Sequence, residues 1–406
     1  MSKFKATFSL KQHTPIIHFQ SEQSGATLRA TELKPKFDRF LIKHVFNNEF
    51  EQYKKYLIGY KEPSKPNEKA MTEKDFEGKK ALDYKVRIVK KKVSDDKVDL
   101  NGLPDERLFM GNMGGGTIQQ IFHRNFEHIV TVNTFNKDLK VILESNFSDF
   151  IFQTNFGGGT SKGFGSFSNK EEVITNYPEN CYSFKVGSKQ LEAVYNSIYY
   201  FYKMLKSGIN EYDKHNSPVF YGKSFLWLYV NNTQDNMTWE KKKIKEFFFK
   251  DELKNQQEKY PNSDILASTK KPFLYRDLLG LSLESDWMSY DNTTISKKSK
   301  NIARFPSPII FKPVLEDDEY IVYFWGVEIS KDILNKTFTI SNGSSDDFDI
   351  STPETFDISK YLEFVSKQNV ATHIDSKFQQ NNEIFKTLQR IFNSMQKVEQ
   401  NSKGIS

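Results

Sequence analysis

The sequence contains a glycine-rich stretch from Asn155 to Phe167 (NFGGGTSKGFGSF), with five glycines, one lysine and three small hydroxyl residues. Glycine can adopt positive φ and allows another backbone to approach closely, because it has no Cβ atom. Successive N–H groups in such a loop can face an anion, and a lysine adds positive charge. The same composition occurs in unconstrained surface loops, but aromatic residues at both ends favour a shaped loop. We therefore predict phosphate contacts by Gly157, Gly158, Gly159, Lys162, Gly163 and Gly165.

Positive charge is clustered elsewhere in the chain, although its net charge is only +6 over 406 residues. Three lysine-rich clusters lie at residues 85–92, 241–245 and 297–300. Such clusters are typical of nucleic-acid binding, and the alternative is a solvated lysine face. Single-stranded RNA is usually held by basic grooves with aromatic stacking. A basic helix near the N-terminus could line such a groove, through Arg29, Lys34, Lys36 and Arg39.

Catalytic signatures are weak. The sequence has no GxxxxGK[ST], HExxH or GxSxG motif, and the glycine-rich stretch follows a predicted helix, whereas a dinucleotide-binding loop precedes one. The lone cysteine, Cys181, and the scattered carboxylates predict neither a metal site nor a cofactor. His13 and His18 flank an apolar run, and histidine can act as a general acid or base. Metal-independent RNA cleavage by His13 or His18 is therefore the alternative function.

The hydrophobic pattern predicts an α+β fold. Residues 3–10, 81–93 and 128–135 alternate as strands do, while residues 37–45 and 139–152 have helical spacing. Strand, helix, strand, strand, helix is the order of a ferredoxin-like (RRM-like) domain.

A second unit of similar type follows. Its predicted elements are a strand at 182–186, an amphipathic helix at 189–206, and a hairpin of residues 304–311 and 319–329. Helices are expected at 358–365 and 374–398 after a polar linker. We predict domains at 1–175 and 176–340, with inserted loops, and a C-terminal helical extension at 341–406.

Three separated stretches resemble the RAMP superfamily of CRISPR-associated proteins. The glycine-rich stretch is similar to the G-rich loop of that family, which follows a helix and ends in GFGS. Residues 14–42 (TPIIHF, then LRATELKPKFDRFLI) resemble its first strand, loop and helix, where Arg29 precedes a Lys-Pro turn. Residues 304–314 (RFPSPIIFKPV) are similar to the RxxSPL segment of the subunit that caps the type III-B (Cmr) effector.

The resemblance implies two tandem ferredoxin-like RAMP domains and assembly beside other RAMP subunits on a guide RNA, in antiviral defence. It implies RNA contact through the G-rich loop and a basic face, to which Arg304 is added, with target RNA as a further ligand. It also implies no catalysis by a capping subunit. The chain departs from the family in two ways: its loop has only Lys162 as a charged residue, and its first helix carries FDRF.

The first ten residues lack the apolar core of a signal peptide, and no run of apolar residues is long enough to span a membrane. We therefore expect a cytoplasmic protein without membrane partners. A third hypothesis is a scaffold that docks a protein partner through Phe378, Phe385 and Phe392. In the alternative, that face packs on its own domain.

Overall fold

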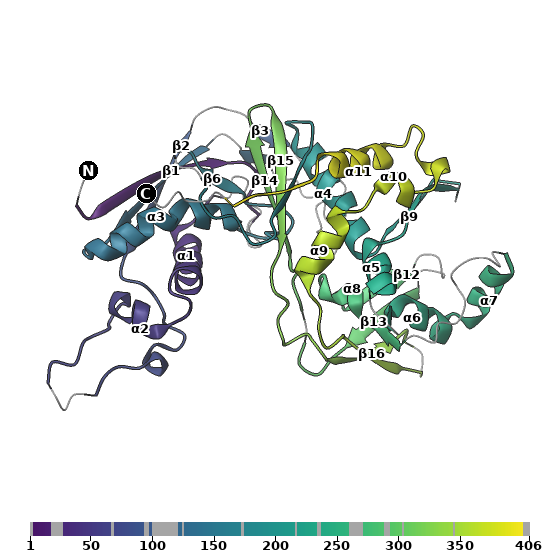
Figure 1. Ribbon diagram of the computed structural model, residues 1–406, viewed down its shortest axis with the longest axis horizontal. Coiled ribbons are helices and arrows are strands. Elements are labelled where there is room, and N and C mark those ends of the chain that lie inside the picture. The colour runs from purple at the N-terminus through teal and green to yellow at the C-terminus, as the bar shows by residue number, and fades with distance from the viewer. Residues whose placement is uncertain are drawn as a thin grey trace.

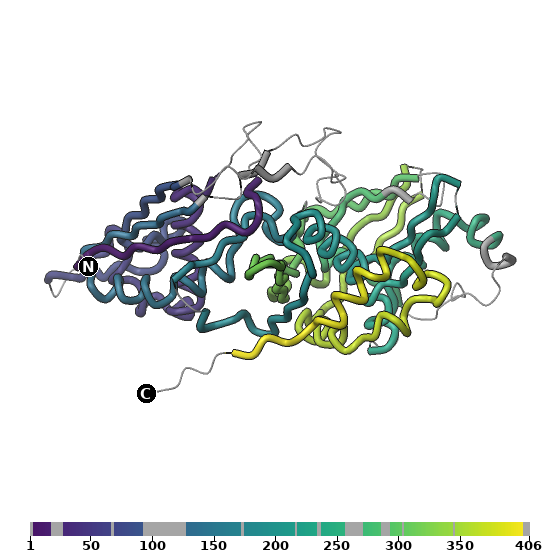
Figure 2. Tube along the Cα trace, turned by 90° about the horizontal axis from the view of Figure 1, so that it is seen from above, coloured from purple at the N-terminus to yellow at the C-terminus, as the bar shows by residue number. Residues whose placement is uncertain are grey.

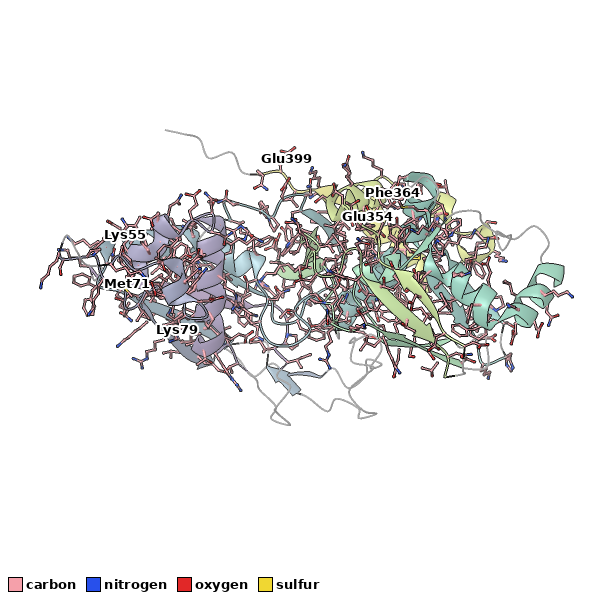
Figure 3. The ribbon with its side chains drawn as sticks, turned by 90° about the horizontal axis from the view of Figure 1, so that it is seen from below. Lys55, Met71, Lys79, Glu354, Phe364 and Glu399 are labelled. Carbon is pink, nitrogen blue, oxygen red and sulfur yellow. The ribbon has the colours of Figure 1, made fainter. Side chains whose placement is uncertain are left out.

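A computed structural model of the chain describes residues 3–17, 27–65, 69–92, 97–99, 121–123, 126–171, 174–215, 217–233, 237–259, 271–287, 293–302, 304–343 and 346–400. The molecule is elongated, with one four-stranded sheet at its N-terminal end and a second near its middle (Figure 1). Seen from above, the C-terminal segment runs back toward the N-terminal half (Figure 2). Figure 3 shows Lys55, Met71 and Lys79 on one half, Glu354 and Phe364 on the other, and Glu399 between them.

The first sheet is antiparallel and has the strand order β2-β5-β1-β6. Its strands are β1 (Lys5–Gln12), β2 (Lys85–Lys92), β5 (Phe126–Asn133) and β6 (Phe167–Asn169), and its helices are α1 (Ala30–His44) and α3 (Lys137–Gln153). Aromatic rings pack these elements together: Phe8 of β1 stacks on Phe147 of α3 at 3.8 Å, and Phe37 of α1 stacks on Phe150 of α3 at 4.5 Å between ring centroids. The apolar faces of both helices are buried in one core with the sheet.

The second sheet is also antiparallel and has the order β14-β15-β7-β18. Its strands are β14 (Ile309–Glu316), β15 (Glu319–Gly326), β7 (Tyr182–Lys185) and β18 (Gln396–Lys397). Helices α4 (Leu191–Lys206), α9 (Ile358–Ser366) and α11 (Glu383–Ser394) contribute to its core. The predicted hairpin is confirmed as β14 and β15, with Asp317 at φ 46° in its turn.

The remaining elements lie mostly between α4 and β14. A third sheet has the order β12-β13-β16-β17, and β3 pairs with β4, β8 with β9, and β10 with β11. The bounds are α2 (Phe50–Tyr53), β3 (Lys97–Asp99), β4 (Ile121–His123), β8 (Ile209–Tyr212), β9 (Pro218–Gly222), α5 (Phe225–Thr233), β10 (Met237–Trp239), α6 (Glu240–Phe248), α7 (Lys250–Lys259), β11 (Lys271–Phe273), α8 (Tyr275–Leu278), β12 (Glu284–Trp287), β13 (Thr293–Lys298), β16 (Thr337–Ser341), β17 (Phe348–Ser351) and α10 (Val370–His373).

Two helix predictions need correction. The spacing predicts a helix from Phe37, whereas α1 begins at Ala30 and contains Pro35, because the Arg29 carbonyl already accepts from the Leu33 amide at 2.9 Å. One helix over 374–398 is wrong: α10 ends at His373 and α11 begins at Glu383, where the Asn382 side chain caps it.

The C-terminal segment is built into the second half. Phe378 and Phe385 are buried in its core and Phe392 packs against that core, so this face packs on its own chain. β18 forms an edge of the second sheet beside β7. The segment predicted as an extension, 341–406, therefore supplies a strand and covering helices to that sheet, while the placing of the domain boundaries stays a prediction.

The two halves are joined where β14 crosses the end of α3. The fully buried Lys312 donates its Nζ hydrogens to the carbonyl oxygens of Ile151, at 2.8 Å, and Thr154, at 2.9 Å. The Asn155 side chain donates to the Phe311 carbonyl at 2.8 Å, and the Ser166 hydroxyl donates to the Pro313 carbonyl at 2.6 Å. The glycine-rich loop therefore lies against β14 and forms part of the joint.

Glycine is required in this joint at two positions. Gly165 has φ +67°, and a Cβ atom there would overlap the carbonyl oxygen of Phe156. Gly163 has φ +88°, and its Cβ would lie 2.8 Å from the Pro313 ring. Close packing explains these two glycines without any ligand.

We predict that Gly165→Ala lowers the free energy of unfolding by about 3 kcal/mol or more, because it adds a backbone overlap to the strain of positive φ. Gly78→Ala is the matched control: Gly78 has φ +73° with no heavy atom within 4 Å of its Cβ position. The control should lose only about 1–2 kcal/mol. Urea denaturation of both variants measures the difference, and equal losses would show that the close approach contributes nothing.

Candidate functional site

A groove of about 990 Å³ lies along the joint between the two halves. Helix α1 supplies Lys36, Arg39 and Lys43 to one wall, and the second half supplies Lys331 and Lys360 to the other. Asn155 and Thr160 of the glycine-rich loop lie between the walls, with Trp325 and Gly326 of β15. Segments distant in the sequence thus share one surface.

The groove is basic with an apolar component. Its cationic residues are Lys36, Arg39, Lys43, Lys331 and Lys360, and its carboxylates are Glu179, Glu328 and Asp357. All of the cations except Lys36 are exposed. Phe40 and Phe356 are partly exposed and add aromatic surface between the charges, whereas Trp325 is only 5% exposed. A surface of this kind suits a polyanion with flat bases.

Lys36 ties α1 to the glycine-rich loop. Its ammonium lies 2.7 Å from Glu32 Oε1, donates to the Asn155 carbonyl at 2.8 Å, and lies 5.0 Å from the centroid of the Phe156 ring. Glu32 Oε1 also accepts the Gly157 amide at 2.7 Å. These contacts hold the wall in place and leave Arg39 and Lys43, farther along the helix, facing solvent.

The other predicted basic residues lie outside the groove. Lys34 donates to Asp38 at 2.7 Å and to the Leu82 carbonyl at 3.0 Å, and its ammonium lies 4.3 Å from the Tyr84 ring centroid. Burial raises the pKa of Asp38, and Lys34 opposes that rise. Arg29 is exposed at the start of α1, and Arg304 is exposed ahead of β14.

The glycine-rich loop donates most of its amide hydrogens inside the chain. Gly158 donates to the Ile17 carbonyl at 2.6 Å, and Gly165 donates to the Pro15 carbonyl at 2.7 Å. The amides of Gly163 and Lys162 donate to carbonyls of the loop itself, and the Gly157 amide donates to Glu32. Phosphate contact by these glycines stays a prediction, and in this conformation those amides are already engaged.

Lys162 is turned inward. Its side chain is 8% exposed, and its ammonium lies 2.8 Å from the centroid of the Tyr202 ring. Burial, with a smaller contribution from Lys206, holds the pKa of Lys162 well below its ordinary value. RNA contact by Lys162 also stays a prediction. In this conformation its ammonium is packed against an aromatic face.

His13 is a joint residue. It is 1% exposed, its Nδ1 accepts the Leu315 amide at 3.0 Å, and its Nε2 lies 2.8 Å from the Ser168 hydroxyl. Since Nδ1 accepts, Nε2 carries the hydrogen in the neutral ring. Both nitrogens are thus occupied in holding β14 to the first half. His18 lies outside the described residues.

The described residues include no group of three His, Cys, Asp or Glu side chains placed to hold a metal ion. None of their helices has both the length and the apolar character needed to cross a bilayer.

Comparison with protein families accounts for nearly the whole chain. Residues 3–209 match the Cmr1 N-terminal domain, and residues 221–397 match the Cmr1 C-terminal domain. The chain belongs to the Cmr1 family. This confirms the resemblance to RAMP proteins, and it indicates a component of a type III-B CRISPR effector complex. No curated protein matches the chain.

Sequence reasoning placed Lys36 and Arg39 in a groove but missed the opposite wall. Lys331 and Lys360 are isolated lysines in unremarkable polar sequence, and only the joint brings them opposite α1. Lys43 could have been found, because it follows Arg39 by one helical turn.

We predict that His13→Ala destabilises the fold by about 1–3 kcal/mol, since it opens space at a buried side chain and leaves the partly buried Leu315 amide without its acceptor. The control is His215→Ala, because His215 is exposed and should change stability by less than about 0.5 kcal/mol. Urea denaturation gives both values. A catalytic His13 would show the reverse: unchanged stability, with loss of a metal-independent RNA cleavage that the unmodified chain performs.

Proposed function

We propose that this Cmr1-family chain is a non-catalytic RNA-binding subunit of a type III CRISPR effector. In this role it contacts guide RNA, and target RNA as a further ligand, and it caps the backbone of RAMP subunits in antiviral defence. The observation that carries the proposal is the groove at the joint, where exposed cations from both halves face one another over aromatic surface. Family membership supplies the setting of a CRISPR effector complex.

We further propose that both sheets are ferredoxin-like domains. In chain order, the first sheet places its fourth strand beside its first, then its third and second, as β6-β1-β5-β2. The second sheet repeats this arrangement as β18-β7-β15-β14. The shared order and the helices that follow each first strand support a tandem pair, with the third sheet inserted in the second domain.

RNA would lie in the groove with its phosphates near Arg39 and Lys43. Phosphate contacts carry no sequence information, so they suit a subunit that must accept any guide. The glycine-rich loop, including Gly157 to Gly165, would line the groove beside the RNA strand through Asn155 and Thr160. Arg29 and Arg304, both exposed, extend the basic surface beyond the groove. This use of the predicted residues is part of the proposal.

The alternative is a metal-independent endoribonuclease that processes repeat RNA through His13 or His18, and the described residues give it no support through His13. It needs a histidine able to exchange a proton with a ribose hydroxyl. The ring of His13 is buried and bonded at both nitrogens. The proposed partners remain guide RNA and neighbouring RAMP subunits. We expect the protein to be cytoplasmic and to need no cofactor.

We predict that the double variant Arg39→Ala/Lys43→Ala weakens binding of single-stranded RNA about equally for unrelated sequences. The salt dependence of log K should become shallower by about 0.7 for each lost phosphate contact. Fluorescence anisotropy at several salt concentrations measures both quantities. The control is Lys250→Ala, an exposed lysine at the start of α7, at the far end of the molecule (Figure 1).

Two results would contradict the proposal. Unchanged affinity and salt slope in the double variant would remove RNA from the groove. Cleavage of a CRISPR repeat RNA by the purified chain without metal would support the endoribonuclease instead.

A further inference from the structure

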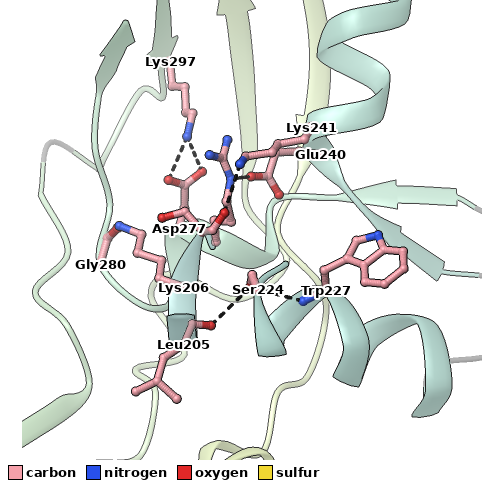
Figure 4. A network of polar contacts seen from close by, with 11 residues as sticks. Leu205, Lys206, Ser224, Trp227, Glu240, Lys241, Asp277, Gly280 and Lys297 are labelled. Carbon is pink, nitrogen blue, oxygen red and sulfur yellow. Dashed lines mark hydrogen bonds and ion pairs between the residues drawn. The ribbon is translucent and has the colours of Figure 1, made fainter. Parts of the chain in front are cut away.

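Two of the lysine clusters that the groove does not use meet in the second half. Lys241 of α6 and Lys297 of β13 come from the clusters at 241–245 and 297–300, and both lie in one polar network with Lys206 and Arg276 (Figure 4). The network surrounds a pocket of about 250 Å³ between the end of α4, α8 and β13. The sequence left two interpretations of these clusters, nucleic-acid binding and a solvated lysine face.

The carboxylates of this network are already paired. Asp277, 1% exposed, accepts two hydrogen bonds from Lys297 Nζ, at 2.8 and 2.7 Å. The fully buried Glu240 pairs with Arg276 Nε. Lys206 donates to the Gly280 carbonyl at 2.5 Å, and Lys241 donates to the Ser207 carbonyl at 3.1 Å, so neither of these lysines meets a carboxylate in those contacts.

Basic side chains therefore outnumber carboxylates in this network. Lys206, Lys241, Arg276 and Lys297 lie around two carboxylates, Glu240 and Asp277. Burial lowers the pKa of Lys206 and of Lys297. Burial, helped by Arg276, lowers the pKa of Lys241 to about 7. Uncompensated buried charge is costly, and an anion in the pocket would offset that cost.

The pocket wall offers donors of the right kind. Arg276 and Lys206 line it together with Lys203, Ser282 and Ser285. Arg276 Nη2 is buried and has no hydrogen-bond partner in the part of the chain that the structure describes. Guanidinium, ammonium and hydroxyl donors around a small cavity are the groups that recognise phosphate oxygens.

We propose that this pocket, formed by Lys203, Lys206, Arg276 and Lys297 with Ser282 and Ser285, is a binding site for a phosphate group. The site is separate from the groove and does not depend on RNA binding there. The phosphate is carried by an RNA strand or is a free anion, and these sources share the same chemistry.

Titration of the full chain with inorganic phosphate at constant ionic strength, followed by thermal unfolding, tests the site. Phosphate should raise the Tm of the unmodified chain saturably, since a ligand of the folded state stabilises it. Lys206→Met should weaken the apparent affinity about tenfold or more. Lys203→Gln, at a half-buried lysine that also lines the pocket, should weaken it as well and keeps the test valid if Lys206→Met fails to fold.

Lys189→Gln, at an exposed lysine just before α4, is the matched control and should keep the full response. The groove variant Arg39→Ala/Lys43→Ala should keep it too, which separates failure of this site from failure of the proposed function. An equal rise of Tm in all variants would overturn the site, because phosphate also stabilises proteins by exclusion from their surface. Absence of any rise in the unmodified chain would overturn it as well.

Competition then identifies the source. Short RNAs with and without a 5′-phosphate are tested for displacement of inorganic phosphate from the unmodified chain. Displacement only by the phosphorylated RNA supports a site for a strand end, and displacement by both supports a backbone phosphate. Displacement by neither, with the phosphate response intact, supports a free anion.

Discussion

The arrangement of the two halves depends on the hydrogen bonds that the Lys312 amino group donates. Lys312 is fully buried and donates to two carbonyls at the end of α3, which would otherwise be unpaired acceptors of a helix terminus. Burial, with a smaller effect of Lys36, holds the pKa of Lys312 well below its ordinary value. A lysine that has lost its proton still keeps two N–H groups. The two hydrogen bonds therefore survive in either protonation state, and the joint escapes much of the cost of burying a charge.

The same strand makes the rest of the joint. β14 is an edge of the second sheet, and its backbone carbonyls accept from Asn155 and Ser166 in the glycine-rich loop. The Leu315 amide donates to His13 at the end of the first sheet. Packing thus explains Gly163, Gly165 and His13. The sequence had predicted phosphate contact for the two glycines and, only in the alternative function, catalysis by His13. The groove is a consequence: its walls face each other because β14 and the loop are held together.

Sequence patterns predicted the parts of the fold that local periodicity determines. The apolar stretches at 304–311 and 319–329 with a turn signal between them, and the amphipathic spacing of α4, identified a hairpin and a helix correctly. The pattern could not show that β18, only two residues long, forms an edge of the second sheet. A pairing between residues about two hundred positions apart leaves no periodic signal, so the C-terminal segment resembled an extension.

Charged residues were predicted least well, for a physical reason. Lysine is normally exposed, so a sequence gives no warning of a buried one. Lys312, Lys297 and Lys162 are all buried, each against a different partner: carbonyls, a carboxylate and an aromatic ring. For the candidate site, Lys36 and Arg39 were found because they share one helix, whereas Lys331 and Lys360 were missed because tertiary structure alone places them opposite.

The joint also sets how the groove can respond to a ligand. Its cations come from both halves, so a polyanion that spans it gains contacts only while the halves keep their relative position. By linkage, such a ligand stabilises the joint, and any change that loosens the joint weakens binding of the ligand by the same free energy. Under the proposed function, the contacts of Lys312 and Ser166, which do not line the groove, would therefore act on binding without touching the bound molecule. Close packing around Gly163 and Gly165 helps to hold the joint and so to shape the groove. The glycine-rich loop thus has a structural role even though most of its amides are occupied.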